Sequence, residues 1–297
     1  MERYKEIERS IITTYRKKIW GPFVKALKTY ELLKENDHVA VCMSGGKDSF
    51  LMAKLFQELQ RHSDFPFDVT YLVMDPGYTD KNRQRIIDNA KMMDIPIHIV
   101  NSNIFEVTEA QEGKPCYLCS RIRRGVLYKN AQNLGCNKIA LGHHFDDVIE
   151  TTLMSMLYNG KFQSMMPKVR SDNFEGMELI RPLYLIHEKD ILAWKNFNEL
   201  EFLQCACRLT ADSSDYETGA MDSKRKEMKN LVKELKKLYP MMDQNIFMAH
   251  HNVNLDTCVG YYKDHKYHSF LEEYEEGEDD GRKIFTPFRE RGNNKTE

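Results

Sequence analysis

The chain has 297 residues, of which 41% are hydrophobic and 30% are charged, and its formal net charge at pH 7 is −2. This length permits one large core with appended segments, and the composition excludes a fully disordered chain. No run of about 18 apolar residues is present, so the sequence predicts no membrane span. The charged stretch 1–6 is not typical of a signal peptide, and we therefore expect a cytoplasmic protein.

The charges are distributed unevenly despite the small net charge. Basic residues gather at 16–18, at 121–129 and along 224–237, whereas acidic residues gather at 272–280. Such segregation favours a polyanion-binding face beside an acidic tail. Ordinary solvated helix faces would give the same pattern along 224–237.

Strands and helices are expected to alternate after an N-terminal helical segment. Residues 1–37 show apolar residues at helical spacings, and Gly21-Pro22 predicts a break into two helices. From His38 onward, short apolar runs alternate with amphipathic segments, which is typical of an α/β fold with a doubly wound parallel sheet. The expected strands are 38–43, 69–74, 97–100, 139–141 and 179–182, and the expected helices include 48–60 and 81–93.

We expect four regions along the chain. They are an N-terminal helical segment at 1–37, a nucleotide-binding α/β domain at 38–200, a C-terminal helical segment at 201–262 and an acidic tail at 263–297. The tail is rich in Tyr, His, Glu and Asp, so we expect an appended arm or a partly disordered segment there.

The most informative stretch follows the first expected strand and reads Ser-Gly-Gly-Lys-Asp-Ser. A strand that opens through paired glycines into a helix places free backbone N–H groups and the positive helix end at one point. Such a point is suited to phosphate, with a lysine to neutralise it and hydroxyl groups to donate hydrogen bonds. The residues predicted to bind the phosphates are Ser44, Gly45, Gly46, Lys47, Asp48 and Ser49.

Two positions distinguish this loop from the common nucleotide loop GxxxxGK[ST]. That motif would need glycine at position 41, where Val41 stands. Asp48 is unusual in an anion site, because its carboxylate repels phosphate. It is expected either to bind Mg²⁺, directly or through water, or to cap the following helix.

Polar residues also follow two later expected strands, 69–74 and 139–141. Because the carboxyl ends of parallel strands meet at one edge, we expect these residues near the phosphate loop. Asp146 and Asp147 lie a few residues after the second of these strands, and they are either helix-start residues or part of an ATP/Mg²⁺ site. The further residues predicted to bind the nucleotide are Met74, Asp75, Gly142 and His143.

A C-x-x-C pair, Cys116 and Cys119, is the second strong motif. Such a pair can form half of a zinc site, a redox dithiol or part of an iron–sulfur site. The other close pair is the C-x-C of Cys205 and Cys207, and three thiolates from these pairs would suit a [4Fe-4S] cluster with one open iron, with zinc as the alternative. The basic stretch 121–124 either binds phosphate or RNA or forms a plain basic helix face.

Together these motifs resemble those of the tRNA 2-thiocytidine synthetases, which are cluster-dependent tRNA thiolases of the PP-loop ATP pyrophosphatase superfamily. The resemblance extends over roughly 30–255 and implies the PP-loop fold for 38–200. The matching segments are SGGKDS at 44–49, PCYLCSRIRRG at 115–125, ALGHHFDD at 140–147 and LIRPLYLIHEKDI at 179–191.

The resemblance also implies a reaction. ATP adenylates the C2 oxygen of a tRNA cytidine, pyrophosphate leaves, and sulfur carried on a [4Fe-4S] cluster then replaces AMP. The implied partners are tRNA, a sulfur donor such as a cysteine desulfurase and a second copy in a homodimer; the implied cofactors are ATP, Mg²⁺ and the cluster. The alternatives are a thiolase of the same scaffold acting on another base, such as uridine, or on a small molecule, and a non-catalytic ATP or metal sensor.

By position, the resemblance assigns Cys116 and Cys119 as the first two cluster ligands. Related chains usually carry C-x-x-C in the later segment, whereas this chain carries C-x-C. The resemblance therefore implies Cys205 as the third ligand, with Cys207 as its competitor.

The catalytic residues are assigned in the same way. Arg123 matches a basic position that acts in catalysis in related thiolases, and Asp147 or Asp146 matches its acidic partner. With Asp48 of the phosphate loop, these are the residues expected to take part in the chemistry.

Overall fold

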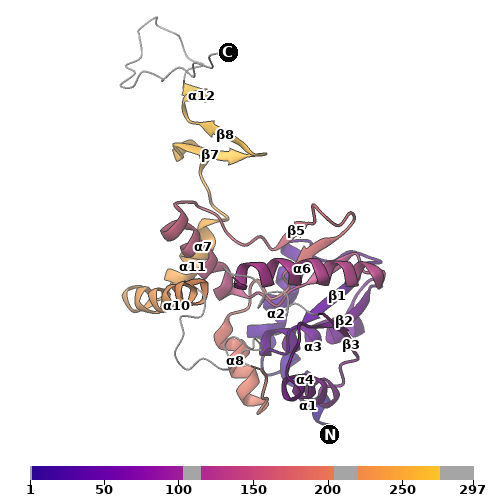
Figure 1. Ribbon diagram of the computed structural model, residues 1–297. Helices are drawn as coiled ribbons and strands as arrows, with labels where there is room; N and C mark the ends of the chain where they lie inside the picture. Colours follow the sequence, from indigo (N-terminus) through magenta and orange to yellow (C-terminus); the bar gives the residue numbers. More distant parts are fainter. Residues whose placement is uncertain (1, 103–114, 204–219, 275–297) are drawn as a thin grey trace, which may run out of the picture. The chain divides into compact units, whose positions relative to one another are not determined.

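A computed structural model describes the backbone of residues 2–102, 115–203 and 220–274 (Figure 1). The side chains of 115–121, 220–223 and 273 lie outside this description. The chain divides into two compact units, Met1–Phe247 and Met248–Glu297.

A six-stranded sheet forms the centre of the first unit, with the strand order β3-β2-β1-β4-β6-β5. Its strands are β1 (His38–Met43), β2 (Asp68–Asp75), β3 (Ile97–Asn101), β4 (Lys138–Ala140), β5 (Lys168–Arg170) and β6 (Glu178–Ile180). Neighbouring strands pair in parallel except β5, which is antiparallel to β6. The chain proceeds from β1 to β2 and β3 on one side and then crosses to β4 on the other. The winding therefore reverses between β1 and β4, where open α/β sheets bind ligands.

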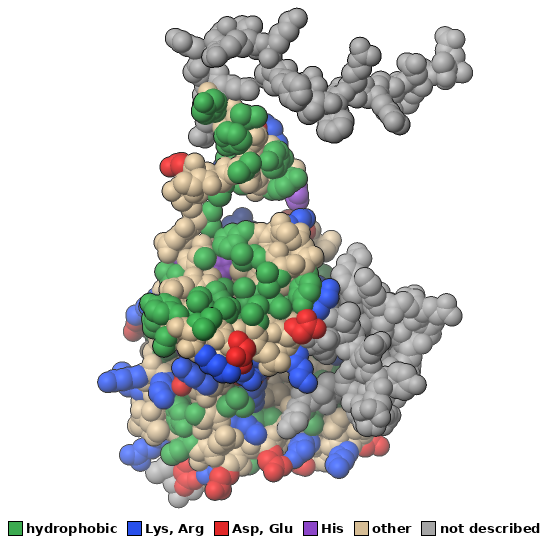
Figure 2. Space-filling model, turned by 90° about the vertical axis from the view of Figure 1, so that its left-hand side faces the viewer, with side chains coloured by type: hydrophobic (Ala, Val, Ile, Leu, Met, Phe, Trp, Pro, Cys, Tyr) green, Lys and Arg blue, Asp and Glu red, His purple; other side chains and the backbone are tan. Residues whose placement is uncertain are grey.

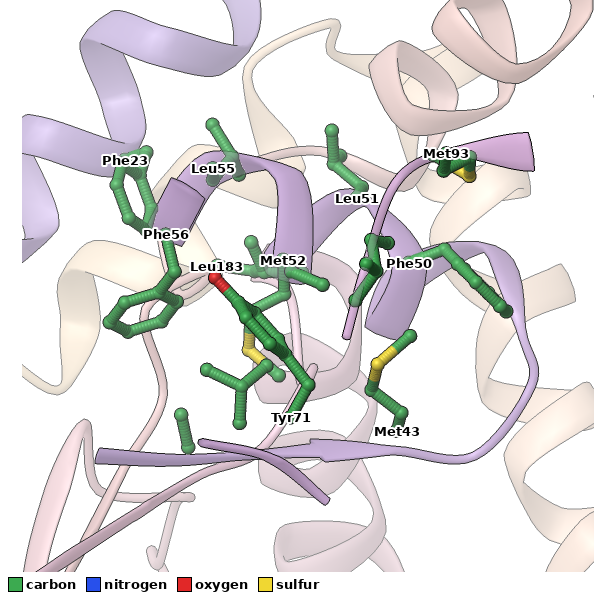
Figure 3. Close-up of a cluster of buried hydrophobic side chains, with 14 of the residues drawn as sticks. Phe23, Met43, Phe50, Leu51, Met52, Leu55, Phe56, Tyr71, Met93 and Leu183 are labelled. Atoms are coloured by element: carbon green, nitrogen blue, oxygen red, sulfur yellow. The ribbon is translucent and has the colours of Figure 1, made fainter. Parts of the chain in front are cut away.

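Helices cover both faces of this sheet. Alternate residues of β1 point to opposite faces, so Val39 and Val41 enter one core and Ala40 and Cys42 enter another. The first core also contains side chains of α1 (Arg3–Ile12), α2 (Gly21–Thr29), α3 (Lys47–His62), α4 (Asp80–Met92) and α8 (Glu188–Phe197), whereas the second contains side chains of α6 (Pro115–Asn133). Figure 3 shows Phe50, Met52 and Phe56 of α3 in the core that also contains Met43 and Tyr71 of the sheet.

A third apolar cluster joins α7 (Phe145–Asn159), α10 (Ala220–Leu238) and α11 (Met242–Ala249). Phe145 at the start of α7 stacks on Phe247 of α11 with ring centroids 4.5 Å apart, and Met228 of α10 joins the same cluster. Since α7 begins just after β4, this cluster places α10 close to the carboxyl edge of the sheet.

The fold class predicted from the sequence is confirmed, because a mostly parallel sheet has helices on both faces. The five expected strands are present with ends that differ by one or two residues. The antiparallel strand β5 was not expected. It has only three residues, and none of them is buried, so the sequence shows no clear alternation of apolar and polar residues there.

The predicted break at Gly21-Pro22 was misplaced. The helix α1 ends at Ile12, and a π-helical turn at Arg16–Trp20 passes directly into α2. Pro22 lies in the first turn of α2, where its missing N–H has no helical partner to lose. The interruption therefore lies at 13–15, before the Gly-Pro pair.

The second unit contains a two-stranded hairpin. It consists of β7 (Gly260–Lys263) and β8 (Lys266–Ser269), and it is preceded by a short 3₁₀ helix, η2 (Leu255–Thr257), and followed by α12 (Leu271–Tyr274). The region boundary predicted at 262/263 falls inside β7, so the described beginning of the tail pairs as a strand.

One face of the first unit carries exposed apolar side chains. Figure 2 shows these side chains gathered in the part of the molecule that carries α7 and α11. Met156 and Leu157 of α7 and Met241 beside α11 are 44%, 57% and 43% exposed. Among the described residues, no helix is long and apolar enough to cross a membrane.

Candidate nucleotide-binding site

The loop between β1 and α3 has a backbone conformation that requires glycine at position 45. Gly45 has a φ of +87°, and a Cβ placed there would lie 2.8 Å from Leu203 and 2.9 Å from Ile86. The Leu203 N–H donates to the Gly45 carbonyl at 3.1 Å, which fixes the loop against the chain that follows α8. Position 45 therefore accepts only glycine without a shift of its neighbours.

The N-terminus of α3 is not capped by a side chain. Gly46 is the N-cap residue and has no side-chain cap hydrogen bond. The first N–H groups of a helix have no helical acceptor, and together with the helix dipole they favour an anion. This end of α3 therefore has the features of a phosphate-binding site, as the sequence predicts.

Ser49 holds the loop in shape. Its hydroxyl donates to the Gly46 carbonyl at 2.8 Å and accepts the Ser44 N–H at 3.3 Å. The side chain is buried, so in this structure Ser49 closes the loop instead of extending toward a ligand.

The expectation that Asp48 caps α3 is wrong, because Gly46 occupies the N-cap position. One Asp48 oxygen, Oδ2, lies 3.1 Å from the Lys47 ammonium. The other, Oδ1, is buried and has no hydrogen-bond partner in the described part of the chain. Because an unsatisfied buried oxygen is costly, this atom fits the alternative prediction of a metal ligand.

The ends of β1 and β4 meet as the topology predicts. A Cβ on Gly142, just after β4, would lie 3.4 Å from the Cβ of Asp48. The next residue, His143, is partly buried, and its Nδ1 is a buried atom without a hydrogen-bond partner among the described residues. Burial lowers the pKa of His143 to about 4, so the imidazole is neutral at pH 7.

Asp146 and Asp147 each use one oxygen to hold a helix start. His144 is the N-cap of α7; its N–H donates to Asp147 Oδ2 at 2.9 Å, and its Nδ1 accepts the Asp147 N–H at 3.4 Å. Asp146 Oδ2 accepts the N–H of Glu188 at the start of α8 at 2.7 Å. The other oxygen of Asp147, Oδ1, lies 3.8 Å from Arg225 of α10.

Glu188 was missed by the sequence analysis. Its Oε1 lies 3.3 Å from the Lys47 ammonium, and its Oε2 forms an ion pair with Lys229 of α10. Our criterion was a polar residue directly after a strand, whereas Glu188 lies seven residues beyond Arg181, which follows β6. Its place within the segment 179–191 that carries the resemblance was the available signal.

Two more ionisable groups, the buried Glu150 and the partly buried Arg181, adjoin the site. Burial and the nearby Asp147 raise the pKa of Glu150 to about 7, although Arg225 lies 3.6 Å from its carboxylate. Burial lowers the pKa of Arg181 to about 10, which still leaves this residue cationic at pH 7. The carboxyl edge of β4 and β6 is therefore a dense mixture of acidic and basic groups.

The residues at the end of β2 have structural roles. Asp75 Oδ1 accepts the N–H groups of Gly77 at 2.9 Å and Tyr78 at 2.7 Å, and its Oδ2 pairs with Arg83 at 2.9 Å. Met74 is buried in the core beneath α6. The Tyr78 hydroxyl contacts the phosphate loop by donating to the Ser44 carbonyl at 3.4 Å.

The predicted metal ligands lie largely outside the described residues. The backbones of Cys116 and Cys119 belong to the first turns of α6, but their side chains are not described. Cys205 and Cys207 fall entirely in the undescribed segment. Arg123 belongs to the same helix as the cysteine pair, one turn after Cys119.

A glycine loop with an uncapped helix start, at the switch point of a mostly parallel sheet, is typical of nucleotide-binding proteins of the α/β class. A family described as the PP-loop domain matches residues 16–212. A protein from Coxiella burnetii, named tRNA-cytidine(32) 2-sulfurtransferase, is 36% identical over 84% of this chain and 93% of its own length. A relative of the same name from Paraburkholderia xenovorans is 36% identical over 77% of this chain, and the match spans 66% of that protein.

Among solved structures, the U34-tRNA thiolase NcsA from Methanococcus maripaludis, determined with its [4Fe-4S] cluster, has a similar fold. The TM-score is 0.61 at 24% sequence identity, over 78% of this chain and 77% of the other. The chain belongs to the PP-loop family of tRNA-cytidine 2-sulfurtransferases, which are enzymes. The family predicted from the sequence motifs is thus confirmed.

Proposed function

We propose that this chain is a tRNA thiolase that uses ATP to replace the C2 oxygen of a tRNA cytidine with sulfur. The observation that carries the proposal is the uncapped N-terminus of α3, beside Lys47 and the unpaired Oδ1 of Asp48. The names of the relatives support tRNA cytidine as the substrate.

The reaction exchanges one atom in two steps. The C2 oxygen of the base attacks the α-phosphate of ATP, and pyrophosphate leaves. Sulfur then attacks C2, and the original oxygen leaves as part of AMP.

The loop residues would bind and orient the nucleotide in the first step. Backbone N–H groups at 45–49 and the Lys47 ammonium would neutralise the phosphates. Asp48 Oδ1 would coordinate Mg²⁺, which would also relieve the repulsion between this carboxylate and the phosphates. His143 is neutral at pH 7 and adds no charge to this edge.

The catalytic assignments remain proposals. We expect Arg123 of α6 to neutralise the anion that leaves C2, because guanidinium binds phosphate through paired hydrogen bonds. Asp147 or Asp146 would be its acidic partner; Asp147 Oδ1 lies 3.8 Å from Arg225, while Asp147 Oδ2 holds the start of α7.

Three cysteines form the donor set proposed for a [4Fe-4S] cluster. Cys116 and Cys119 would bind it from the start of α6, and Cys205, or Cys207 in its place, would supply the third thiolate. Three soft thiolates fit such a cluster, and zinc with a fourth ligand is the alternative. When bound, the cluster would supply an open iron that carries the sulfur atom.

The test is nucleoside mass spectrometry of tRNA from a strain that lacks the gene. We expect 2-thiocytidine to disappear in that strain and to return with the wild-type chain but not with Cys116→Ala. Unchanged 2-thiocytidine, with loss of a thiouridine instead, would reject cytidine as the base. A matched control is Cys136→Ala, because Cys136 is buried in the core beneath α6 and away from the predicted ligands in the sequence.

The remaining partners are also proposals. A homodimer is supported by the exposed apolar side chains on α7, and sedimentation velocity of the full chain tests it. A cysteine desulfurase as sulfur donor and a cytoplasmic location stay predictions of the sequence.

A further inference from the structure

One carboxylate connects the phosphate loop to a helix far along the chain. Glu188 Oε1 lies 3.3 Å from the Lys47 ammonium, and Glu188 Oε2 pairs with the ammonium of Lys229 on α10. The backbone N–H of Glu188 is held by Asp146 Oδ2 at 2.7 Å, so the carboxylate has a fixed place at the start of α8.

The two lysines have different further contacts. Lys47 also lies 3.1 Å from Asp48 Oδ2, which leaves its ammonium between two carboxylates at the edge where phosphate is expected. Lys229 is 42% exposed and belongs to α10, beyond the residues 16–212 that match the PP-loop domain. Burial opposes ionisation of Glu188, but Lys229 and Lys47 outweigh it and lower the pKa of this carboxyl below its usual range.

ATP binding would change this balance of charges. The phosphates compete for Lys47, and Lys47 would then give up its contact with Glu188. The Glu188 carboxylate would remain close to the phosphates and would repel them unless another cation neutralised it.

We propose that Glu188 pairs with Lys47 while the loop is empty, and that Lys229 neutralises Glu188 after Lys47 has turned to the phosphates. Lys229 thereby makes α10 part of the nucleotide site. The inference rests on the proposed ATP binding at this loop, but it does not depend on which base is thiolated.

The experiment is calorimetric titration of the full chain with Mg²⁺ and the uncleavable ATP analogue AMPCPP, without tRNA. The variants are Lys229→Gln, Lys229→Arg, Glu188→Gln and the double variant Glu188→Gln/Lys229→Gln. Thermal unfolding of each variant, measured in parallel, shows that the protein titrated is folded.

Removing the charge of Lys229 and removing that of Glu188 should have different effects on the affinity for AMPCPP. Lys229→Gln should weaken binding of the analogue about tenfold, because it leaves the Glu188 charge uncompensated beside the phosphates. Lys229→Arg should bind as the wild type does, and Glu188→Gln at least as tightly as the wild type. The double variant should bind within about twofold of Glu188→Gln, since the repelling charge is gone.

A matched control removes another ion pair of the same helix. Lys236 of α10 pairs with the buried Asp243 of α11, so Lys236→Gln should lower the thermal stability without changing the affinity for AMPCPP. Equal affinities of Lys229→Gln and Lys236→Gln would overturn the inference while the proposed function stands. Equal weakening by Lys229→Gln and the double variant would also overturn it, because the pair would then only dock α10. A wild-type chain that fails to bind AMPCPP would overturn the proposed function and this inference together.

Discussion

The helices α3 and α7 begin at the same edge of the sheet, but their N-terminal N–H groups are treated differently: those of α3 have no side-chain cap, whereas α7 has one. The N-cap of α3 is Gly46, which has no side chain to satisfy the first N–H groups. The N-cap of α7 is His144, which exchanges two hydrogen bonds with Asp147 in a complete capping box. One helix start is open, and the other is closed by its own residues.

This difference explains how neighbouring strand ends divide their tasks. An open helix start offers N–H groups and a positive dipole end to an anion, so phosphate is expected at α3. A capped start offers fewer such groups, and it fixes the side chains that are expected to surround the phosphate. Glu188 connects this start to the phosphate loop, because its N–H is held by Asp146 and its carboxylate lies 3.3 Å from the Lys47 ammonium.

The largest effect should come from straining the loop that leads to the open start of α3. Gly45→Ala would combine a φ of +87° with contacts of 2.8 and 2.9 Å to Leu203 and Ile86. We expect a loss of about 2–4 kcal/mol in unfolding free energy and no measurable ATP binding. Gly46→Ala is the control, because its Cβ would meet nothing closer than 3.6 Å, and its unfolding midpoint in urea should stay near that of the wild type. Equal destabilisation by both variants would refute the steric account of the loop.

Removing the cation at the open start should have the next largest effect. Lys47→Met keeps most of the side-chain length but removes the charge that faces the phosphates. We expect tRNA-dependent release of pyrophosphate to fall about 100-fold. Lys18→Met is a surface control, because Lys18 is 65% exposed and its carboxylate partner is 3.7 Å away. Wild-type pyrophosphate release by Lys47→Met would place the phosphates elsewhere.

Opening the closed start should cost less. His144→Ala removes the cap of α7, and we expect a loss of about 1 kcal/mol in unfolding free energy. His144→Asn should recover most of this stability, because asparagine is a good N-cap residue. Guanidinium denaturation of the three proteins measures the difference, and an uncapped variant as stable as the wild type would contradict the role of the capping box.

The smallest effect concerns the buried carboxyl of α7. The folded-state pKa of Glu150 is about 7, above its usual 4.5, so ionisation opposes folding as the pH rises through this range. Glu150→Gln should therefore raise the melting temperature by about 2 °C at pH 8.5 and leave it nearly unchanged at pH 5. A gain of the same size at both pH values would show that charge is not the cause.

Much of this edge could be predicted from local patterns. The apolar run 38–43, the paired glycines after it and the return of apolar residues at 139–141 are local signals, and parallel strands bring their carboxyl ends together. The family motifs then supplied the reaction. These inferences need no knowledge of side-chain partners.

The partners themselves could not be read from the sequence. Lys47, Glu188 and Lys229 meet only because three helices pack at one edge, and no spacing in the chain links them. Asp75 follows a strand as a ligand would, yet the turn after β2 uses one of its oxygens and Arg83 of α4 uses the other. His144 is a cap although histidine is not among the usual capping residues, so the closed start of α7 was also hidden.

The central claim is that ATP bound at the open start of α3 activates the C2 oxygen of a tRNA base. The most direct measurement uses tRNA whose target cytidine carries ¹⁸O at C2, incubated with the cluster-loaded chain, ATP, Mg²⁺ and a sulfide source without oxygen. Mass spectrometry of the products should find one ¹⁸O atom in AMP for each 2-thiocytidine formed. AMP without the label, in a reaction that still produces 2-thiocytidine, would contradict the account.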